Sequence, residues 1–319
     1  MRELSFIASY LQADDDYTII CHVSPDGDTL GSGLALYGAL RKLNKRVQIV
    51  CQDPLPRVYA FLPFSDALTL AEGAMQTQNA ISIDCAAPDR LGTAAALFEN
   101  AKHTLNIDHH ATNGAYAGDN CVWDTAATGE ILFDLLEMMG LIDADIATCL
   151  YTAIMTDTGN FAYANTMPET LHTAAELLED GADNAYITRC VYRTMPFPKI
   201  KLLGLALSQA TLFCDGRIGL SRISKQDFAD AGAAGEDVEG IIDYIRDVDT
   251  VEIAILVREA AAGVCKVSLR SKTTADVGSV SARMNGGGHK RAAGYTDHGT
   301  LDEVCDRAVQ MTSALLANL

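Results

Sequence analysis

The sequence predicts an α/β fold in which an N-terminal, doubly wound parallel sheet is followed by a smaller α+β domain with a mixed sheet. Over the first two thirds of the chain, short β-branched runs alternate with helical patterns, which is typical of parallel strands joined by right-handed crossovers. These runs are apolar throughout, as strands covered on both faces must be. After residue 217 the pattern changes, because two strand-like runs follow one another directly.

The elements of the first domain follow from these runs and from helical periodicity. Strands are expected at residues 17–23, 46–51, 80–85 and 103–108, where β-forming residues cluster. Helical patterns lie at residues 31–43, 91–100, 128–139, 144–155, 168–179 and 183–193.

Two prolines, Pro196 and Pro198, interrupt the chain after these helices, and an apolar helix at residues 200–212 is expected to connect the two halves. The expected organisation is a first domain at residues 1–194, a linker helix within residues 195–213 and a second domain at residues 214–319. In order, the second domain is predicted to contain a strand from residue 217, a helix at 238–248, strands at 252–259 and 264–271, a helix, a Gly-rich loop and a final helix at 300–319.

Charge and composition exclude several classes of function. The 319 residues include 24 Lys+Arg against 42 Asp+Glu, which gives a formal net charge of −18. Because sequence-independent binding of long nucleic acids depends on many Lys/Arg–phosphate contacts, we expect no long nucleic acid as a partner. No apolar run approaches the ~18 residues that a membrane span needs, and the N-terminus lacks the pattern of a signal peptide. We therefore expect a cytoplasmic protein without a membrane partner.

The nine cysteines do not form a metal-binding or disulfide pattern. They are an odd number, and no two lie closer than 24 residues along the chain. A disulfide framework or a zinc knuckle is therefore not expected, and the thiols are predicted to be reduced and mostly buried.

Acidic and imidazole side chains follow three of the predicted strands and one helix. The four segments are HVSPDGD at residues 22–28, SIDC at 82–85, NIDHH at 106–110 and TDTGNF at 156–161. Ligands of an open parallel sheet bind outside the carboxyl ends of its strands, so we expect these side chains to meet in one crevice.

Four carboxylates in that crevice, Asp26, Asp28, Asp84 and Asp157, would repel one another strongly. Two divalent cations would remove the repulsion. Oxygen ligands mixed with imidazole favour manganese, with magnesium, iron or cobalt as alternatives, and the absence of thiolates argues against a structural zinc. The competing interpretation is a set of ordinary turn and cap residues, which becomes weaker as more such residues gather at the strand ends.

The four segments, in this order, resemble the four motifs of the DHH phosphoesterase superfamily, which is named after its Asp-His-His. A distal segment, NGGGHKRAAG at residues 285–294, resembles the signature of the DHHA1 domain that follows in many members. The resemblance covers nearly the whole chain. In length and two-domain layout the chain is most similar to the nanoRNase/pAp-phosphatase branch.

The resemblance implies two sets of metal ligands that share one aspartate. The first set is His22, Asp26 and Asp84, and the second is Asp28, Asp84, His109 and Asp157. By the same resemblance, His110 would face the substrate phosphate as an electrophile or general acid. Asp108 would orient the histidines, because metal-bound imidazoles donate their other N–H to such a group.

Substrate-binding groups are expected in the second domain, at Arg270, Asn285, Gly287, Gly288 and His289. Residues 266–291 hold six basic residues against one acidic residue, and consecutive glycines let backbone N–H groups approach an anion. The plainer alternatives are a simple Gly-rich turn and, for Arg270, an ion pair within its own domain. The substrate is expected to bridge a cleft between the two domains.

The expected activity is the hydrolysis of phosphoester bonds by a water that two metals activate. The substrates would be short oligoribonucleotides (nanoRNA), adenosine 3′,5′-bisphosphate (pAp) or both, and the same site suits cyclic dinucleotides. An exonuclease acting on long strands and an inorganic pyrophosphatase are disfavoured by the domain content, and a nucleotide-binding sensor is the non-enzyme alternative. The sequence leaves open the preferred substrate, the cleavage direction, the metal and the oligomeric state, for which a homodimer is one candidate.

Two further signals lie near the first and third strands. Gly31 and Gly33 suggest a dinucleotide-binding fingerprint, but Leu36 stands where a third glycine belongs, so a tightly packed helix is the preferred interpretation. Arg90, six residues after Asp84, suits a phosphate-binding role and a surface or capping role equally well.

Overall fold

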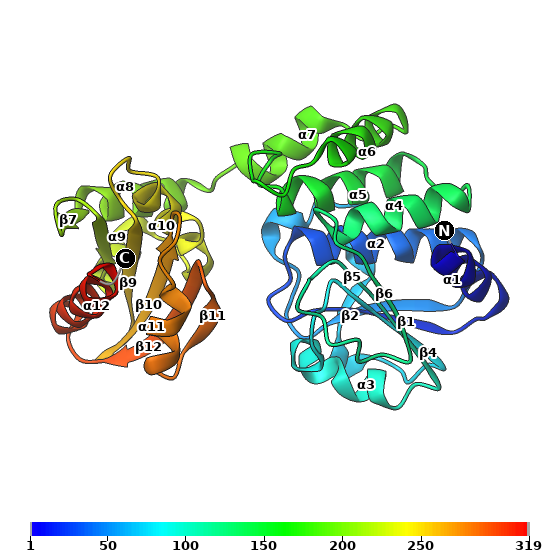
Figure 1. Cartoon of the computed structure of the whole chain (residues 1–319), viewed down its shortest axis with the longest axis horizontal. Helices are drawn as coiled ribbons and strands as arrows, with labels where there is room; N and C mark the ends of the chain where they lie inside the picture. The colour runs from blue at the N-terminus through cyan, green and yellow to red at the C-terminus, as the bar shows by residue number, and fades with distance from the viewer. Residues whose placement is uncertain (1, 318–319) are drawn as a thin grey trace. The chain divides into compact units, whose positions relative to one another are not determined.

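The computed structural model describes residues 2–317 of the chain and contains two compact units, Met1–Thr194 and Met195–Leu319. Each unit has its own sheet (Figure 1). Hydrophobic residues are buried on both faces of each sheet. Within the described residues, no helix combines the length and the apolar character that crossing a membrane requires.

The first unit is built on a six-stranded sheet with all neighbouring strands parallel, in the order β3-β2-β1-β4-β5-β6. The strands are β1 (Tyr17–Cys21), β2 (Val47–Cys51), β3 (Leu68–Leu70), β4 (Asn79–Ile83), β5 (His103–Asp108) and β6 (Asp119–Val122). This confirms the predicted parallel sheet and its four inner strands. Strands β3 and β6 were not predicted, because these edge strands are short and β6 is also polar.

Helices cover both faces of this sheet (Figure 1). Ile19 and Ile20, adjacent in β1, illustrate the two faces, because the first packs with α2, α4 and α5 and the second packs with α3 and the turns before it. The helices are α1 (Arg2–Ala13), α2 (Gly27–Lys42), α3 (Ala95–Glu99), α4 (Thr128–Met138), α5 (Ala144–Asp157), α6 (Pro168–Glu179) and α7 (Asn184–Thr188). Short 3₁₀ segments occur at Arg57–Tyr59, Ser65–Ala67, Ala71–Gly73 and Pro88–Ala94, the last with a kink at Gly92, and a π-helical segment occurs at Arg189–Arg193.

Helix α2 begins four residues earlier than the helical periodicity predicts. Asp26 is its N-cap, and the side chain accepts hydrogen bonds from the N–H groups of Asp28 at 3.1 Å and Thr29 at 3.2 Å. The helix packs closely on α5. A Cβ atom at Gly31 would lie only 2.4 Å from the carbonyl oxygen of Cys149, so the position has no room for a side chain. Gly31 thus allows close helix packing, which agrees with the interpretation preferred from the sequence.

The second unit contains a mixed six-stranded sheet in the order β11-β12-β10-β9-β8-β7, in which only β8 and β9 run parallel. The predicted mixed sheet is therefore confirmed. Its strands are β7 (Thr211–Phe213), β8 (Ile218–Ile223), β9 (Ile253–Ala261), β10 (Val264–Ser271), β11 (Gly287–His289) and β12 (Ala292–His298). Its helices are α8 (Phe197–Ser208), α9 (Lys225–Ala231), α10 (Ile241–Arg246), α11 (Val277–Arg283) and α12 (Leu301–Leu316), with a short turn at Gly235–Val238.

Alternate residues of β9 separate two cores in this unit. Ile253 and Ile255 pack with α11 and α12, whereas Ala254 and Leu256 pack with α8, α9 and α10. Helix α8 occupies most of the segment expected as a linker. It packs with α9 and α10 in the core on their side of the sheet. The hydroxyl of Ser221 donates a 2.7 Å hydrogen bond to the carbonyl of Ala206 in this helix.

The Gly-rich segment differs from the predicted loop. Residues 287–298 form the antiparallel pair β11 and β12, and Ala293 and Tyr295, two residues apart, point into the core. The small residues at 292–294 have low β-propensity, so the strand was not recognisable from the sequence. In the structure it is defined by its pairing with β10. The predicted final helix is present as α12, and residues 318–319 of that prediction lie outside the described residues.

Replacing Gly31 with Ala is expected to lower the free energy of unfolding by about 1–3 kcal/mol, because the added methyl group would collide with the α5 backbone. Thermal or denaturant unfolding measures this change. Gly73→Ala is the matched control, since nothing lies within 4 Å of a Cβ atom at that position. Equal stability of the two variants would show that α2 and α5 do not depend on the close approach.

Candidate metal centre

The candidate site lies at the carboxyl ends of three neighbouring strands, β1, β4 and β5. Strand β1 pairs with both β2 and β4, so chain connections leave the sheet in opposite directions at this point and open a crevice there. Asp84, which directly follows β4, has a left-handed backbone with φ +56°, and its N–H donates to the carbonyl of Ile107 in β5 at 2.9 Å. This unusual turn fixes the carboxylate at the strand end.

The first cluster contains His22, Asp26 and Asp84. The Nε2 atom of His22 lies 3.6 Å from Oδ2 of Asp26 and 3.5 Å from Oδ2 of Asp84. His22 and Asp84 are buried, whereas the Asp26 side chain is exposed. The cluster therefore opens towards solvent on the side of Asp26.

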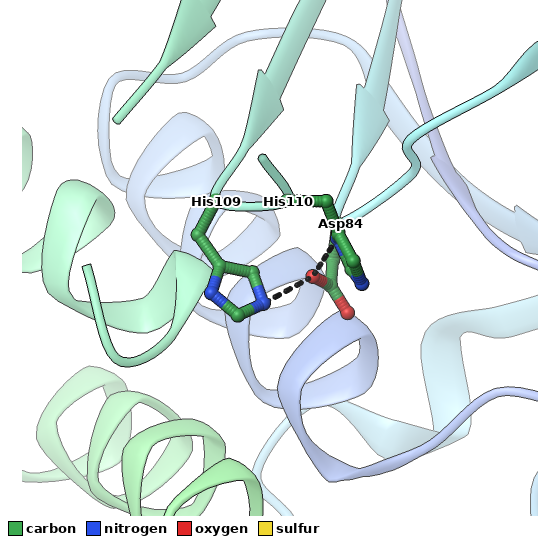
Figure 2. A group of neighbouring side chains, drawn as sticks. All are labelled: Asp84, His109 and His110. Carbon is green, nitrogen blue, oxygen red and sulfur yellow. Dashed lines mark ion pairs between the residues drawn. The ribbon is translucent and has the colours of Figure 1, made fainter. Parts of the chain in front are cut away.

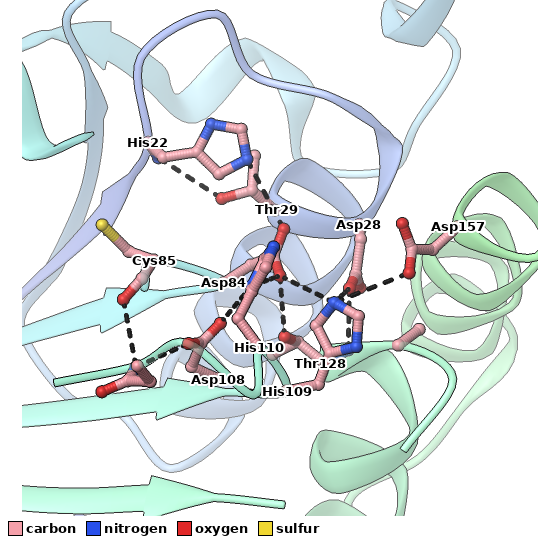
Figure 3. Close-up of polar contacts among 12 residues, drawn as sticks. His22, Asp28, Thr29, Asp84, Cys85, Asp108, His109, His110, Thr128 and Asp157 are labelled. Atoms are coloured by element: carbon pink, nitrogen blue, oxygen red, sulfur yellow. Dashed lines mark hydrogen bonds and ion pairs between the residues drawn. The ribbon is translucent and has the colours of Figure 1, made fainter. Parts of the chain in front are cut away.

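The second cluster surrounds His109 and consists of two overlapping groups, one of Asp28, His109 and Asp157 and the other of Asp84, His109 and His110. The Nε2 atom of His109 lies 3.9 Å from Oδ2 of Asp28, 3.6 Å from Oδ1 of Asp84 and 3.5 Å from Oδ2 of Asp157. The Oδ1 atom of Asp84 also faces His110, at 3.6 Å from Nδ1 (Figure 2). The two oxygens of Asp84 thus face different clusters, and Asp84 lies between the rings of His22 and His109 (Figure 3).

The rings of His22 and His109 are oriented so that the Nε2 atom of each faces the carboxylates. The Nδ1 atom of His22 lies 2.9 Å from the carbonyl of Val23, and that of His109 lies 3.1 Å from the carbonyl of Thr125. A carbonyl only accepts, so Nδ1 of His109 carries the proton, whereas Nδ1 of His22 faces both the carbonyl of Val23 and, at 2.9 Å, the donor Nη2 of Arg90. An unprotonated Nε2 aimed at carboxylates is repulsive unless a cation lies between them. Distances of 3.5–3.9 Å exceed good hydrogen bonds and suit ligands around one ion with bonds of about 2.1 Å.

The pKa values of the clustered acids and of His22 also indicate that the site favours added positive charge. Burial raises the pKa of Asp28 well above its usual range, and the neighbouring carboxylates of Asp84, Asp157 and Asp26 raise it further. Burial also raises the pKa of Asp157 to about 6. Although burial lowers the pKa of His22, the carboxylates of Asp26 and Asp84 outweigh it and raise that pKa to about 10. This donor set therefore fits divalent cations, which would replace protons as the compensating charge.

Thr128, at the start of α4, contacts two of the clustered carboxylates. Its N–H donates to Oδ2 of Asp28 at 2.7 Å, and its hydroxyl donates to Oδ1 of Asp84 at 3.0 Å. The N–H of Gly129 and the hydroxyl of Ser32 each donate to Oδ1 of Asp28 at 3.0 Å. These donors hold the carboxylates in place at the positive end of α4. Thr128 was not predicted as a site residue, because in the sequence it is indistinguishable from any residue in the first turn of a helix.

His110 faces Asp84 but is hydrogen-bonded to Asp108. The Nδ1 atom of His110 lies 2.7 Å from Oδ1 of Asp108, and Asn113 donates to the other oxygen at 2.5 Å. These hydrogen bonds outweigh burial and lower the pKa of Asp108, while Asp108 raises the pKa of His110. In the described part of the chain, the Asp108 carboxylate hydrogen-bonds to His110 but not to His109, which the carbonyl of Thr125 holds instead.

The expected substrate-binding residues all lie in the second unit. Asn285, Gly287, Gly288 and His289 are exposed around β11, and Gly288 has φ +131°, where a Cβ atom would lie 2.5 Å from the carbonyl oxygen of Ala292. Arg270 lies in β10 and lines a pocket of about 250 Å³ in this unit. Its Nη1 donates to the carbonyl of Leu269 at 3.1 Å, and it takes part in none of the ion pairs found among residues 2–317.

Comparison with known proteins assigns both units to family models. Residues 16–154 match the DHH family, N-terminal domain, and residues 218–318 match the DHHA1 domain. A Thermus thermophilus protein named bifunctional oligoribonuclease and PAP phosphatase NrnA is 36% identical over 97% of this chain and 93% of that protein. A Streptococcus mutans protein named probable bifunctional oligoribonuclease and PAP phosphatase NrnA is 30% identical over 93% of this chain and 94% of that protein.

A solved structure also has this fold. The crystal structure of an exopolyphosphatase-related protein from Bacteroides fragilis superimposes with a TM-score of 0.91 and is 27% identical in sequence. The match covers 99% of this chain and 96% of that chain.

Replacing Thr128 with Val keeps the backbone N–H that binds Asp28 but removes the hydroxyl that binds Asp84. We expect Mn²⁺ affinity to fall about 10- to 100-fold, because groups that orient ligands have effects of this size. Calorimetric titration of metal into the protein measures the change. Thr148→Val, elsewhere in the same unit on α5, is the control. Unchanged Mn²⁺ affinity in Thr128→Val would refute the role assigned to the hydroxyl.

Proposed function

The chain belongs to the DHH phosphoesterase family, and from this premise we propose that it hydrolyses short oligoribonucleotides and adenosine 3′,5′-bisphosphate. The observation that carries the proposal is the arrangement of two His–carboxylate clusters on the two oxygens of Asp84. The names of the Thermus thermophilus and Streptococcus mutans relatives support the choice of substrate, since these proteins align over nearly their whole length.

In this proposal the site holds two divalent cations, with manganese as the first candidate. The first ion would be held by His22, Asp26 and Asp84, and the second by Asp28, Asp84, His109 and Asp157. Carboxylates mixed with imidazoles and no thiolate favour Mn²⁺ over Zn²⁺, while Mg²⁺, Co²⁺ and Fe²⁺ are the alternatives. When bound, such a pair supplies Lewis acidity at the phosphate and a water activated for attack.

His110 and Asp108 would assist the departure of the leaving group. Asp108 binds Nδ1 of His110 and raises the pKa of its ring, so the imidazolium can hold a proton on Nε2. From Nε2 that proton can be donated to the leaving oxygen or shared with a phosphate oxygen. Asn113 completes the arrangement by keeping the Asp108 carboxylate in an orientation that accepts from His110.

We assign metal binding and catalysis to residues 1–194 and recognition of the remaining nucleotide to residues 214–319, with residues 195–213 joining them. Arg270 would bind a phosphate that is not cleaved, since its guanidinium has no carboxylate partner among the described residues. Asn285, Gly287, Gly288 and His289 would supply exposed backbone and side-chain donors. All nine cysteines are unpaired, which supports a reducing compartment such as the cytoplasm.

Hydrolysis of pAp is expected to stop when the metal is removed by EDTA and to return with Mn²⁺. Asp84→Asn should lower kcat/KM more than about 100-fold, because it alters both clusters, whereas loss of an orienting group alone costs 10- to 100-fold. Asp66→Asn, in a surface turn away from the site, is the control. Full turnover in excess EDTA after dialysis would contradict metal dependence.

The length of RNA that the protein prefers follows from its charge. With a net charge of −18, the protein should repel long polyanions, so kcat/KM should fall as RNA grows from about 2–5 to about 24 nucleotides. The penalty should shrink at higher salt. Rates on oligoribonucleotides, pAp and cyclic dinucleotides, measured side by side, test this proposal. Equal or faster cleavage of the longest RNA at low salt would overturn it, and a preference for cyclic dinucleotides would replace the proposed substrate.

A further inference from the structure

Arg90 brings an unpaired positive charge to the edge of the metal centre. Its Nη2 atom lies 2.9 Å from Nδ1 of His22, on the side of the ring opposite to the carboxylates that Nε2 faces. Although four carboxylates gather in this region, Arg90 belongs to none of the ion pairs formed within residues 2–317. The residue is exposed, so its guanidinium is accessible to a ligand from solvent.

The turn that carries Arg90 is fixed to the ends of β1 and β2. The N–H of Val23 donates to the carbonyl of Arg90 at 2.8 Å, and the N–H of Thr93 donates to Oε1 of Gln52 at 3.0 Å. Gly92 has φ +56°, and a Cβ atom there would lie 2.3 Å from Oε1 of Gln52 and 2.5 Å from Cγ1 of Val23. Such a closely packed turn holds the backbone of Arg90 beside the site instead of leaving it on a mobile loop.

His22 cannot accept a hydrogen bond from Arg90 on Nδ1 while its Nε2 atom binds a metal. Its Nδ1 atom has two neighbours at 2.9 Å, the carbonyl of Val23, which only accepts, and the guanidinium of Arg90, which only donates. When Nε2 is used as a ligand, Nδ1 keeps its proton and donates it to the carbonyl. The nearest N–H of Arg90 then has no acceptor on His22 and needs one from elsewhere.

The net charge of the site with two metal ions bound indicates which group would accept the hydrogen bond from Arg90. Two divalent cations balance the four clustered carboxylates, so a phosphate group brings negative charge that the metal centre alone does not neutralise. Arg90 is a permanently charged cation that contacts a residue of the first cluster. A guanidinium presents paired N–H donors that match two phosphate oxygens, which an ammonium group cannot reproduce.

We propose that Arg90 is a phosphate-binding residue of the metal centre, which holds a non-bridging oxygen of the substrate phosphate once a metal occupies Nε2 of His22. This inference rests on the proposed function for the identity of the substrate. The anion contact itself follows from the geometry around His22 and can be measured without turnover.

The test compares Arg90→Ala, Arg90→Lys and the control Arg41→Ala, an exposed arginine in the last turn of α2. Inorganic phosphate is titrated calorimetrically into each protein in the presence of Mg²⁺, and metal affinity is measured separately without phosphate. Arg90→Ala should weaken phosphate binding about 10- to 150-fold, the range for one charge-assisted contact, with metal affinity changed less than about 3-fold. Arg90→Lys should recover only part of the loss, and Arg41→Ala should match the wild type.

Hydrolysis of pAp by the same proteins separates this inference from the proposed function. With Arg90→Ala, kcat/KM should fall by the same factor as phosphate affinity. Wild-type phosphate binding and wild-type kinetics in Arg90→Ala would overturn the role of Arg90 while leaving the proposed function intact. A loss of metal affinity as large as the loss of phosphate affinity would also overturn it, because Arg90 would then only position His22. Conversely, absent hydrolysis by the wild type together with Arg90-dependent phosphate binding would refute the proposed function alone.

Discussion

Repulsion among carboxylates at the ends of parallel strands is the constraint on which this site depends. Asp84 is at its centre, because one oxygen faces His22 and the other faces His109. The protein donates hydrogen bonds to these acids mainly from neutral groups, such as the backbone and hydroxyl of Thr128. Neutral donors fix where the carboxylates lie but leave their charge uncompensated. Burial raises the pKa values of Asp28 and Asp157, and the neighbouring carboxylates add to this increase.

The fold concentrates these groups by its topology. Because β1 pairs with β4, the residues that follow both strands are neighbours, although they lie about sixty positions apart in sequence. The N-termini of α2 and α4 then meet at Asp28, which lies in the first turn of one helix and accepts N–H groups from the other. Close packing of α2 on α5 at Gly31 keeps that first turn near Asp157, the last residue of α5. Sheet order, helix caps and one close helix contact therefore act together to assemble the site.

Much of this arrangement could be predicted from the sequence, for identifiable reasons. The inner strands of the first sheet are continuous apolar runs, and acidic or imidazole residues follow three of them, so both the strands and their clustering were recognisable. The edge strands were not, because a three-residue strand such as Leu68–Leu70 is defined by its partner rather than by its own residues. The same holds for Ala292–His298, which follows the glycines of the predicted loop and begins with small residues. Thr128 and the precise place of Arg90 depend on contacts between distant segments, which local patterns do not contain.

The most direct test of this account is to count the metal ions that each chain binds. Equilibrium dialysis against Mn²⁺, with metal and protein quantified after dialysis, should give two ions per chain for the wild type. Asp84→Asn should retain fewer than one, because one residue serves both clusters. Binding of no ion by the wild type, or two ions by Asp84→Asn with unchanged affinity, would contradict a centre organised around a shared carboxylate.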